Sequence, residues 1–289
     1  MITFKLVRNR LIFCFAIFLV ACGEKESTEE TTSTIEETSS DQVADQEETS
    51  SDQSTTVQEV SLDQAAYKSG TTYKFGHNSI PNIKITGAPE DIDYSRWAML
   101  HDGGDYRLYF FKDGTNDTMY QFAFNASSSA YEYGYNSIPE LKITGMPSDA
   151  STSSFAMLHD GSDYRLYMLS KSGSPKLYQA AFNRSSSKYE YGYNSINTID
   201  ITGAPSDTDF DRWGMLHDGS AYRLYFFKNN SADNFYQFAY NSSTQDYEYG
   251  FNSINVLTLQ STPQQSDTSS FAMLHDGSAY RFYYRRLDN

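Results

Sequence analysis

The sequence repeats itself every 58 residues, and this periodicity constrains the fold more than any other feature. The segment Met-Leu-His-Asp-Gly occurs four times at that spacing, at 99–103, 157–161, 215–219 and 273–277. Repetition at a fixed period, without a single insertion, is typical of arrays in which each supersecondary unit buries its apolar face against a neighbour. The sequence therefore predicts four similar units.

Each repeat is predicted to contain four short β-strands. In the third copy one hairpin, with glycine at its turn, joins 213–217 to 222–228, and a second hairpin joins 235–240 to 247–251. Aromatic and β-branched residues dominate these segments, and no window has the 3.6-residue period of a helix. Four copies of a four-stranded meander favour an all-β fold, a four-bladed β-propeller that leaves few sheet edges open.

The two ends of the repeat region complement each other. The fourth copy stops after its second strand, at Tyr283-Tyr284, whereas 62–67 and 73–76 match the third and fourth strands of the other copies. Two strands from each end would complete one blade and close the ring non-covalently. The propeller is assigned to residues 61–289.

The residues before the repeats have a different composition. Residues 1–21 combine three cations with an apolar run from 11 to 21, which is too short to span a bilayer. Residues 22–60 hold twelve acidic side chains and no aromatic residue, so they cannot bury a core. We expect a signal peptide over 1–21, followed by a disordered acidic tether over 22–60.

The end of the expected signal peptide, Leu19-Val20-Ala21-Cys22, resembles the lipobox of bacterial lipoproteins. In that family cleavage precedes the cysteine, which is then acylated, so the resemblance implies a lipid anchor on Cys22. Gly23 in the next position resembles the pattern of outer-membrane retention in Gram-negative sorting. We expect an extracytoplasmic protein held by this lipid to a bacterial membrane, at the outer membrane or cell surface. The alternative is an ordinary secretory signal with an incidental cysteine.

Several short elements of the repeats resemble the hemopexin-type repeat. They are Gly87-Ala-Pro89 with Asp91 and Asp93, Tyr109-Phe-Phe-Lys112, Tyr120, and Gly134-Tyr135 with Ile138. Members of that family are four-bladed propellers that often hold a cation on backbone carbonyls in the central channel. The resemblance therefore implies one axial cation, calcium or a transition metal. The copies here are longer than the usual repeat, the closing disulfide of animal members is missing, and the family's haem site, which lies between two propellers, does not carry over.

One histidine per repeat stands in the recurrent His-Asp-Gly segment. The four are His101, His159, His217 and His275. A ring of four neutral imidazoles could bind copper, zinc or nickel at one mouth of the channel. Alternatively, each histidine hydrogen-bonds within its own blade while the aspartate caps the turn. Every copy keeps the motif, as a duplicated structural element would, and this favours the structural interpretation.

The copies also alternate between two types. The odd copies carry an aspartate, an arginine and a tryptophan, namely Asp93, Arg96 and Trp97 and then Asp209, Arg212 and Trp213. The even copies have Ser154-Phe155 and Ser270-Phe271 at the last two of these positions. This alternation is either core packing, with a large ring facing a smaller one, or a pair of pockets that suit a sugar or a peptide.

A set of tyrosine and asparagine side chains adds amphipathic surface of the kind that recognition sites favour. The set consists of Tyr133, Tyr135, Tyr191 and Tyr193, with Asn136 and Asn194. The alternative role for these tyrosines is packing between the outer strands of neighbouring blades.

Charge and motifs exclude several classes of function. The net charge is −15 and the repeats contain no run of lysine or arginine, which excludes nucleic-acid binding. The sequence has no Gly-rich phosphate loop, GxSxG or HExxH motif, and near-identical repeats do not give one side chain the distinct environment that acid–base catalysis needs. We predict a non-catalytic, lipid-anchored module that binds a glycan or protein ligand. Metal capture by the histidines and a purely structural scaffold are the alternatives.

Overall fold

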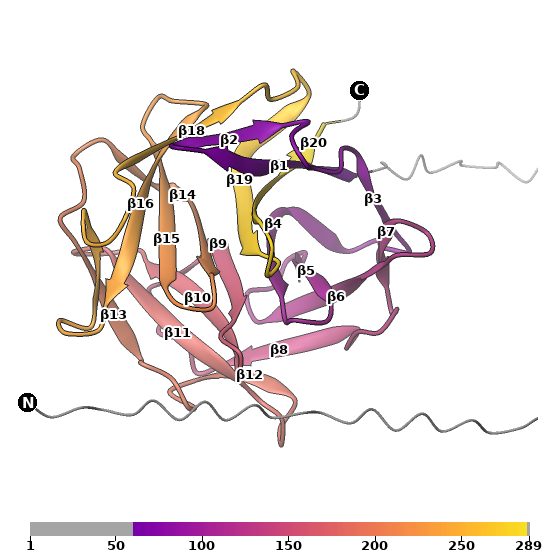
Figure 1. Ribbon diagram of the computed structural model, residues 1–289. Coiled ribbons are helices and arrows are strands. Elements are labelled where there is room, and N and C mark those ends of the chain that lie inside the picture. Colours follow the sequence, from indigo (N-terminus) through magenta and orange to yellow (C-terminus); the bar gives the residue numbers. More distant parts are fainter. Residues whose placement is uncertain (1–59, 288–289) are drawn as a thin grey trace, which may run out of the picture. The chain divides into compact units, whose positions relative to one another are not determined.

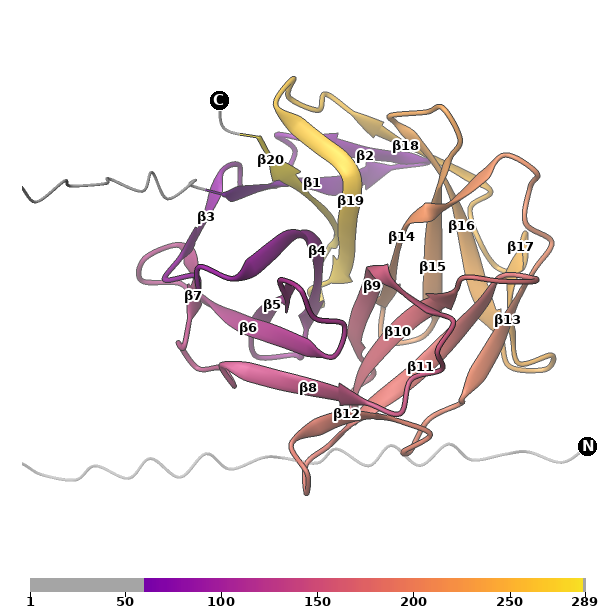
Figure 2. The same ribbon diagram turned by 180° about the vertical axis from the view of Figure 1, so that it is seen from behind.

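The computed structural model describes residues 60–287, and every regular element in this range is a β-strand (Figures 1 and 2). The twenty strands form one mixed sheet. No helix that could span a membrane occurs in this range. The expected signal peptide, Cys22 and the expected tether up to residue 59 lie outside the described residues.

Each repeat contributes five strands, and their lengths recur from copy to copy. The first strands are β4 (Ile92–His101), β9 (Ala150–His159), β14 (Thr208–His217) and β19 (Ser266–His275). The second are β5 (Tyr106–Lys112), β10 (Tyr164–Ser170), β15 (Tyr222–Lys228) and β20 (Tyr280–Arg286). The third are β6 (Thr118–Asn125), β11 (Lys176–Asn183), β16 (Asn234–Asn241) and β1 (Ser61–Ser69).

The remaining strands are short. The fourth are β7 (Ala130–Tyr133), β12 (Lys188–Tyr191), β17 (Asp246–Tyr249) and β2 (Thr72–Phe75). The fifth are β8 (Glu140–Thr144), β13 (Thr198–Thr202), β18 (Val256–Gln260) and β3 (Ile83–Thr86). We call β4–β8 unit 1, β9–β13 unit 2, β14–β18 unit 3, and β19, β20, β1, β2 and β3 unit 4.

The fifth strand corrects the prediction of four strands per repeat. In unit 1, β8 pairs antiparallel with β6 of its own unit and parallel with β12 of unit 2. Its residues alternate strictly between buried and exposed, with Leu141 and Ile143 facing inward. That period of two is the signal of a strand with one buried face, and it is legible in the sequence.

The fourth and fifth strands connect the units into a closed ring of twelve strands. The ring runs β1–β2–β18–β16–β17–β13–β11–β12–β8–β6–β7–β3 and returns to β1. The first and second strands of each unit extend inward from this ring. The four first strands meet in the middle, where β4 and β14 each contact both β9 and β19 (Figure 1).

The two ends of the described chain pair directly, as the sequence predicts. β1 runs antiparallel to β20, with Leu62 opposite Arg285 and Ala65 opposite Phe282. Leu62 and Ala65 are fully buried, so this junction belongs to the core. Unit 4 is therefore assembled from strands of both ends.

The apolar core consists of four clusters of buried residues, and each cluster joins two neighbouring units. In one of them, Tyr109 and Phe111 of unit 1 pack with Phe155 and Met157 of unit 2. The first strands carry four consecutive buried residues, such as 97–100, because both of their faces are covered by neighbours. Each large side chain buried in this way contributes about 1.5–3 kcal/mol relative to an exposed one.

Candidate functional site

The two tryptophans that the sequence singled out are buried. Trp97 and Trp213 are each 2% exposed. Their indole N–H groups donate to serine hydroxyls of the even units, at 2.7 Å from Trp97 to Ser270 and 2.6 Å from Trp213 to Ser154. Both indoles therefore lie in the core, but each meets a serine hydroxyl and not the smaller ring that the packing interpretation expects. A buried indole offers no face on which a ligand can stack, and this corrects the prediction of two tryptophan-walled pockets.

The acidic and basic partners of those tryptophans do come together. Arg96 Nε lies 2.5 Å from Asp93 Oδ2, and Arg212 Nε lies 2.7 Å from Asp209 Oδ2. Each guanidinium also lies 4.6 Å from the centre of a phenylalanine ring of its own unit and donates to backbone carbonyls there. These arginines therefore hold the ends of strands together within a unit.

The four histidines end the four central strands. Each ring lies 4.4–4.7 Å from the ring of the tyrosine that begins the next strand, as His101 does with Tyr106. Burial lowers the pKa of His101 and His217, and the charge of His275 adds to that lowering in both cases. Among residues 60–287, no group of three or more histidine, cysteine or acidic side chains is arranged to hold a metal ion. This finding does not test the predicted four-histidine site, which stays a prediction.

The aspartate after each histidine caps its turn. Asp102 Oδ1 accepts hydrogen bonds from the backbone N–H groups of Gly104 and Asp105, at 3.1 and 2.7 Å. Its other oxygen, Oδ2, accepts from Arg107 Nε at 2.7 Å and from the Tyr164 hydroxyl of unit 2 at 3.0 Å. The His-Asp-Gly segment thus links neighbouring units as well as closing a hairpin.

These contacts set the charge of the capping aspartate. Burial by itself raises the pKa of Asp102, but the N–H donors of Asp105, Arg107 and Gly104 together lower it to about 2. The equivalent aspartates, Asp160, Asp218 and Asp276, have lowered pKa values for the same reason.

The structure contains four equivalent pockets, one at each junction between neighbouring units. Their volumes are about 510, 500, 650 and 390 Å³. One wall comes from the first unit of the pair and the other wall from the next unit. We name each pocket after its arginine, in the order Arg107, Arg165, Arg223 and Arg281.

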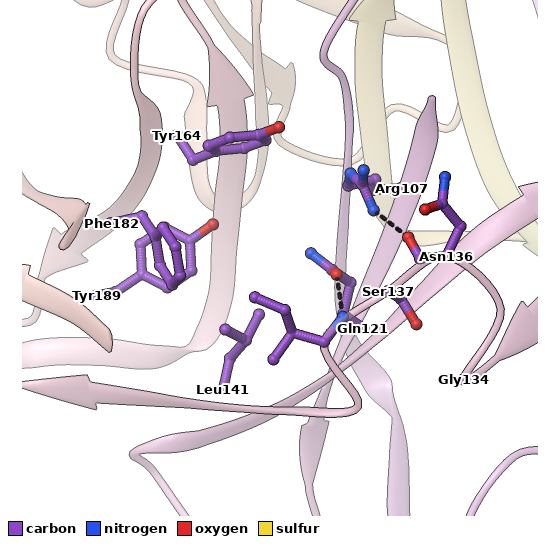
Figure 3. A pocket seen from close by; sticks show the side chains of 10 residues that line it. Arg107, Gln121, Gly134, Asn136, Ser137, Leu141, Tyr164, Phe182 and Tyr189 are labelled. Carbon is purple, nitrogen blue, oxygen red and sulfur yellow. Dashed lines mark hydrogen bonds between the residues drawn. The ribbon is translucent and has the colours of Figure 1, made fainter. Parts of the chain in front are cut away.

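The two walls of the Arg107 pocket differ in chemistry (Figure 3). Unit 2 supplies three rings, those of Tyr164, Phe182 and Tyr189. On the opposite side, unit 1 supplies the polar residues Arg107, Gln121, Asn136 and Ser137. The cavity is therefore amphipathic, with flat apolar surface facing hydrogen-bonding groups.

The polar wall is held rigidly. Arg107 Nη1 donates to the backbone carbonyl of Asn136 at 2.7 Å, which fixes the loop that follows β7. Gln121 donates to the buried Tyr109 hydroxyl at 2.7 Å and accepts from the Ile138 N–H at 2.8 Å. Asn136 adopts a φ of 41°, a left-handed conformation that asparagine tolerates better than most residues. These bonds fix the positions of the polar groups of this wall.

A buried serine hydroxyl borders three of the four pockets without a partner. Within the described chain, Oγ of Ser137, Ser195 and Ser253 makes no hydrogen bond, and each serine lines its pocket. A buried hydroxyl without a partner is costly unless another group satisfies it.

Two adjacent residues of every repeat serve two different pockets. Tyr164 belongs to the Arg107 pocket, whereas the next residue, Arg165, lines the pocket between units 2 and 3. Successive side chains of a strand point to opposite faces, so the Tyr-Arg pair at the start of β10 faces both neighbouring units. Each unit thereby supplies an aromatic wall to one junction and a polar wall to the next.

Only part of this site could be predicted from the sequence. Asn136 and Asn194, which were predicted from it, do line pockets. The tyrosines Tyr135 and Tyr193 are each 42% exposed on the same loops, whereas Tyr133 and Tyr191 pack against the core. The arginines, the glutamines and the tyrosines that begin the second strands were not predicted as site residues. Their signal was present in the Tyr-Arg dipeptide that all four copies keep at 106, 164, 222 and 280.

No protein-family model matches the sequence, and no curated protein matches it either.

Proposed function

We propose that the protein is a non-catalytic binding module that recognises glycans through the four pockets between its units. The observation that carries this proposal is the fourfold recurrence of one amphipathic cavity, with an aromatic wall facing an arginine, a glutamine and an asparagine. A sugar ring has both kinds of surface, since its C–H faces pack on aromatic rings and its hydroxyls exchange hydrogen bonds with amides and guanidinium groups.

The size and shape of the pockets favour a saccharide over a protein surface. Their volumes fall in the range of about 300–1,000 Å³ that small-ligand sites occupy. A protein partner of ordinary affinity needs a broad interface of about 800 Å² on each side. Separate concavities on one scaffold suit the repeated residues of a glycan chain better.

Four weak sites on one scaffold would act together. When a glycan engages a second pocket, that binding is intramolecular, and avidity can exceed the affinity of one site by about 10²–10⁴. Repetition would therefore compensate for the modest affinity that one sugar in one shallow pocket provides.

We further propose that the four units are the blades of a four-bladed propeller at the end of a lipid-anchored tether. The closed ring of strands and the four central strands support the propeller. The lipobox-like sequence that ends at Cys22 supports the anchor and an extracytoplasmic location at the bacterial outer membrane or cell surface. Replacing Cys22 with serine should release the protein from the membrane fraction, and retention of the variant there would overturn the anchor.

A glycan array with two matched variants tests the binding function. The first variant replaces the partly buried ring of each pocket with leucine, at Phe182, Tyr240, Tyr67 and Phe124. The control makes the same change at rings outside the pockets, at Tyr133, Tyr191, Tyr249 and Phe75. Both variants keep apolar side chains, so thermal unfolding can verify that each remains folded.

We expect the natural protein and the control to bind the same glycans and the pocket variant to lose at least tenfold in affinity. Equal binding by both variants, or no glycan bound by the natural protein, would refute the proposed function.

A further inference from the structure

The four pockets are not identical, because one residue of the turn before the second strand differs between units. Units 1 and 2 have an aspartate there, Asp105 and Asp163, whereas units 3 and 4 have Ala221 and Ala279. The rest of each turn follows the same pattern, with the capping aspartate three residues earlier.

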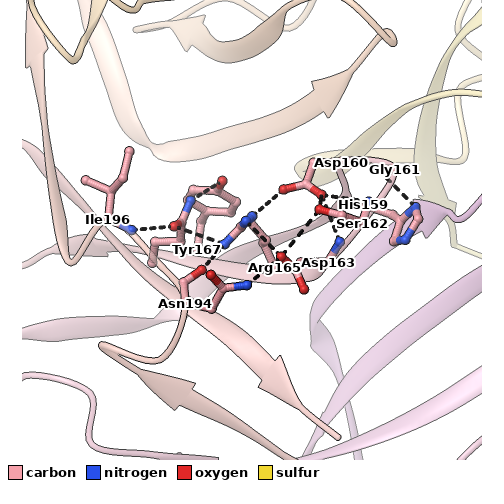
Figure 4. A network of polar contacts seen from close by, with 10 residues as sticks. His159, Asp160, Gly161, Ser162, Asp163, Arg165, Tyr167, Asn194 and Ile196 are labelled. Atoms are coloured by element: carbon pink, nitrogen blue, oxygen red, sulfur yellow. Dashed lines mark hydrogen bonds and ion pairs between the residues drawn. The ribbon is translucent and has the colours of Figure 1, made fainter.

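In units 1 and 2 this aspartate bridges two donors of the polar wall. Asp105 Oδ2 accepts from Arg107 Nη2 at 3.0 Å and from Asn136 Nδ2 at 2.7 Å. The second unit repeats the arrangement, since Asp163 Oδ2 lies 3.2 Å from Arg165 Nη2 and 2.7 Å from Asn194 Nδ2 (Figure 4). A carboxylate is thus seen twice in the place where the guanidinium and the amide converge.

In units 3 and 4 the same donors remain and the carboxylate is missing. Arg223 is held as its counterparts are, with Nε 3.0 Å from Asp218 Oδ2 and Nη1 donating to the Asn252 carbonyl at 2.8 Å. Within residues 60–287, no hydrogen bond engages Arg223 Nη2 or Asn252 Nδ2.

Unit 4 is equivalent to unit 3 in this respect. Arg281 uses Nε for Asp276 and Nη1 for Gln64 and the Asn78 carbonyl. In the described part of the chain, Arg281 Nη2 and Asn78 Nδ2 have no partner.

The formal charge of the pockets differs accordingly. In each pocket the arginine is matched by one capping aspartate, such as Asp102 for Arg107 and Asp218 for Arg223. Asp105 and Asp163 add a second negative charge beside the arginines of the first two pockets, although neither aspartate is a lining residue. Counted with the carboxylates that contact each arginine, the formal charge at Arg107 and at Arg165 is −1, whereas the formal charge at Arg223 and at Arg281 is zero. An anion is repelled by the first pair and meets unused N–H donors in the second.

Resting on the proposed glycan function, we propose that the Arg223 and Arg281 pockets bind a carboxylate-bearing sugar. The ligand carboxylate takes the place between the guanidinium and the asparagine amide that Asp105 and Asp163 occupy in the other two pockets. The Arg107 and Arg165 pockets take neutral sugars, because their donors are already satisfied by a carboxylate of the chain itself.

Calorimetric titration of the purified protein with small glycosides tests this assignment. The acidic probes are the methyl glycosides of glucuronic, galacturonic and N-acetylneuraminic acid, and the neutral probes are methyl glucoside and methyl galactoside. Two double variants exchange the pocket types. One is Ala221→Asp with Ala279→Asp, and the other is Asp105→Ala with Asp163→Ala.

We expect at least one acidic glycoside to bind at two sites per chain. The aspartate-adding variant should weaken that binding at least tenfold without changing the binding of neutral glycosides. The aspartate-removing variant should raise the number of acidic sites to four. These variants change a partly exposed turn residue, and thermal unfolding monitors their folding.

Binding of the acidic probes that neither double variant alters would overturn the inference, and so would the absence of binding by all three acidic probes. The glycan function itself is judged separately, on the array. If the leucine variant of the pockets loses binding to neutral glycans, the glycan function is upheld even when the carboxylate assignment fails.

Discussion

The indole N–H of Trp97 on β4 donates to the hydroxyl of Ser270 on β19, 2.7 Å away, and so joins unit 1 to unit 4. Trp213 joins unit 3 to unit 2 in the same way. The other two junctions use ring contacts instead, such as Phe111 with Phe155 at 4.9 Å. Junctions with a Trp–Ser hydrogen bond therefore alternate around the ring with junctions that use ring contacts. This alternation explains why the repeats fall into two types.

The tryptophan junction leads to a prediction about stability. Replacing Ser270 with alanine leaves the buried indole N–H without an acceptor, which should lower the free energy of unfolding by about 1–3 kcal/mol. Ser269→Ala, at the exposed neighbouring position, is the control; it removes only an exposed hydrogen bond to Asp267 and should change the free energy of unfolding by no more than about 0.5 kcal/mol. Urea denaturation measures both, and equal effects would show that the hydrogen bond does not stabilise the junction.

The glycine at 214 should resist replacement by the residue that the other repeats use. Repeats 1, 2 and 4 have alanine at this position, but a Cβ on Gly214 would lie 2.9 Å from Cε2 of Phe271. That ring is stacked on Phe282 at 4.8 Å and cannot move freely. Gly214→Ala should therefore cost about 1–3 kcal/mol through overpacking.

A second substitution tests the cause of that cost. In a Phe271→Leu background, Gly214→Ala should be less destabilising than in the natural chain, because the ring that it meets is gone. Thermal or urea unfolding is measured for the natural protein, for each single variant and for the double variant, which together form a double-mutant cycle. An unchanged cost would mean that another contact, such as that with Met273 Cγ at 3.4 Å, and not the ring, opposes the extra methyl group.

Acid should loosen the junctions between units. The pKa of Asp102 is lowered in the folded state, from an unfolded value of about 3.9 to about 2. A group with a depressed folded pKa stabilises the protein above its unfolded pKa, and this stabilisation is lost as the pH falls through the folded value. The three equivalent aspartates shift in the same direction. The urea concentration at the midpoint of unfolding should therefore decrease as the pH is lowered from about 4 to about 2.

The control for this prediction is Asp102→Asn, which cannot titrate. Its urea midpoint should lie below that of the natural protein at pH 6 and should change less between pH 4 and pH 2. An identical pH profile would show that Asp102 does not contribute to the acid sensitivity.

Closure of the ring should be essential for a monomeric fold. Deleting the residues up to Gly76 removes β1 and β2, and it leaves β20 as an open edge with Phe282 uncovered. Open apolar edges pair with other chains, so the truncated protein should associate or lose cooperative unfolding. Sedimentation and thermal unfolding check this, and a stable monomer would contradict the account of the closure.

The repeat period predicted much of this architecture, because identical spacing demands identical units. It predicted the pairing of the chain ends, and it predicted the hairpins around the His-Asp-Gly turns. The fifth strands were missed although Leu141 and Ile143 show the required alternation. From the sequence, burial of Trp97 in the core is only one of two interpretations, because the sequence does not show which unit lies opposite.

The pockets were missed for a related reason. Arg107 and Tyr164 lie in different repeats, and only the assembled ring brings them together. Within one repeat the Tyr-Arg pair looks like a single motif, although its two side chains belong to different sites. The difference between Asp105 and Ala221 is visible in the sequence, but only the hydrogen bond from Asn136 to Asp105 gives it a meaning.

The most direct test of the glycan function is the number of saccharide sites per chain. A calorimetric titration with the methyl glycoside of one sugar from the tightest-binding glycan provides that number, because such a probe is too small to occupy two pockets at once. Binding in the repeated pockets predicts two or four sites per chain, all lost in the leucine variant of Phe182, Tyr240, Tyr67 and Phe124. A single site per chain, or sites that survive those four substitutions, would contradict the account.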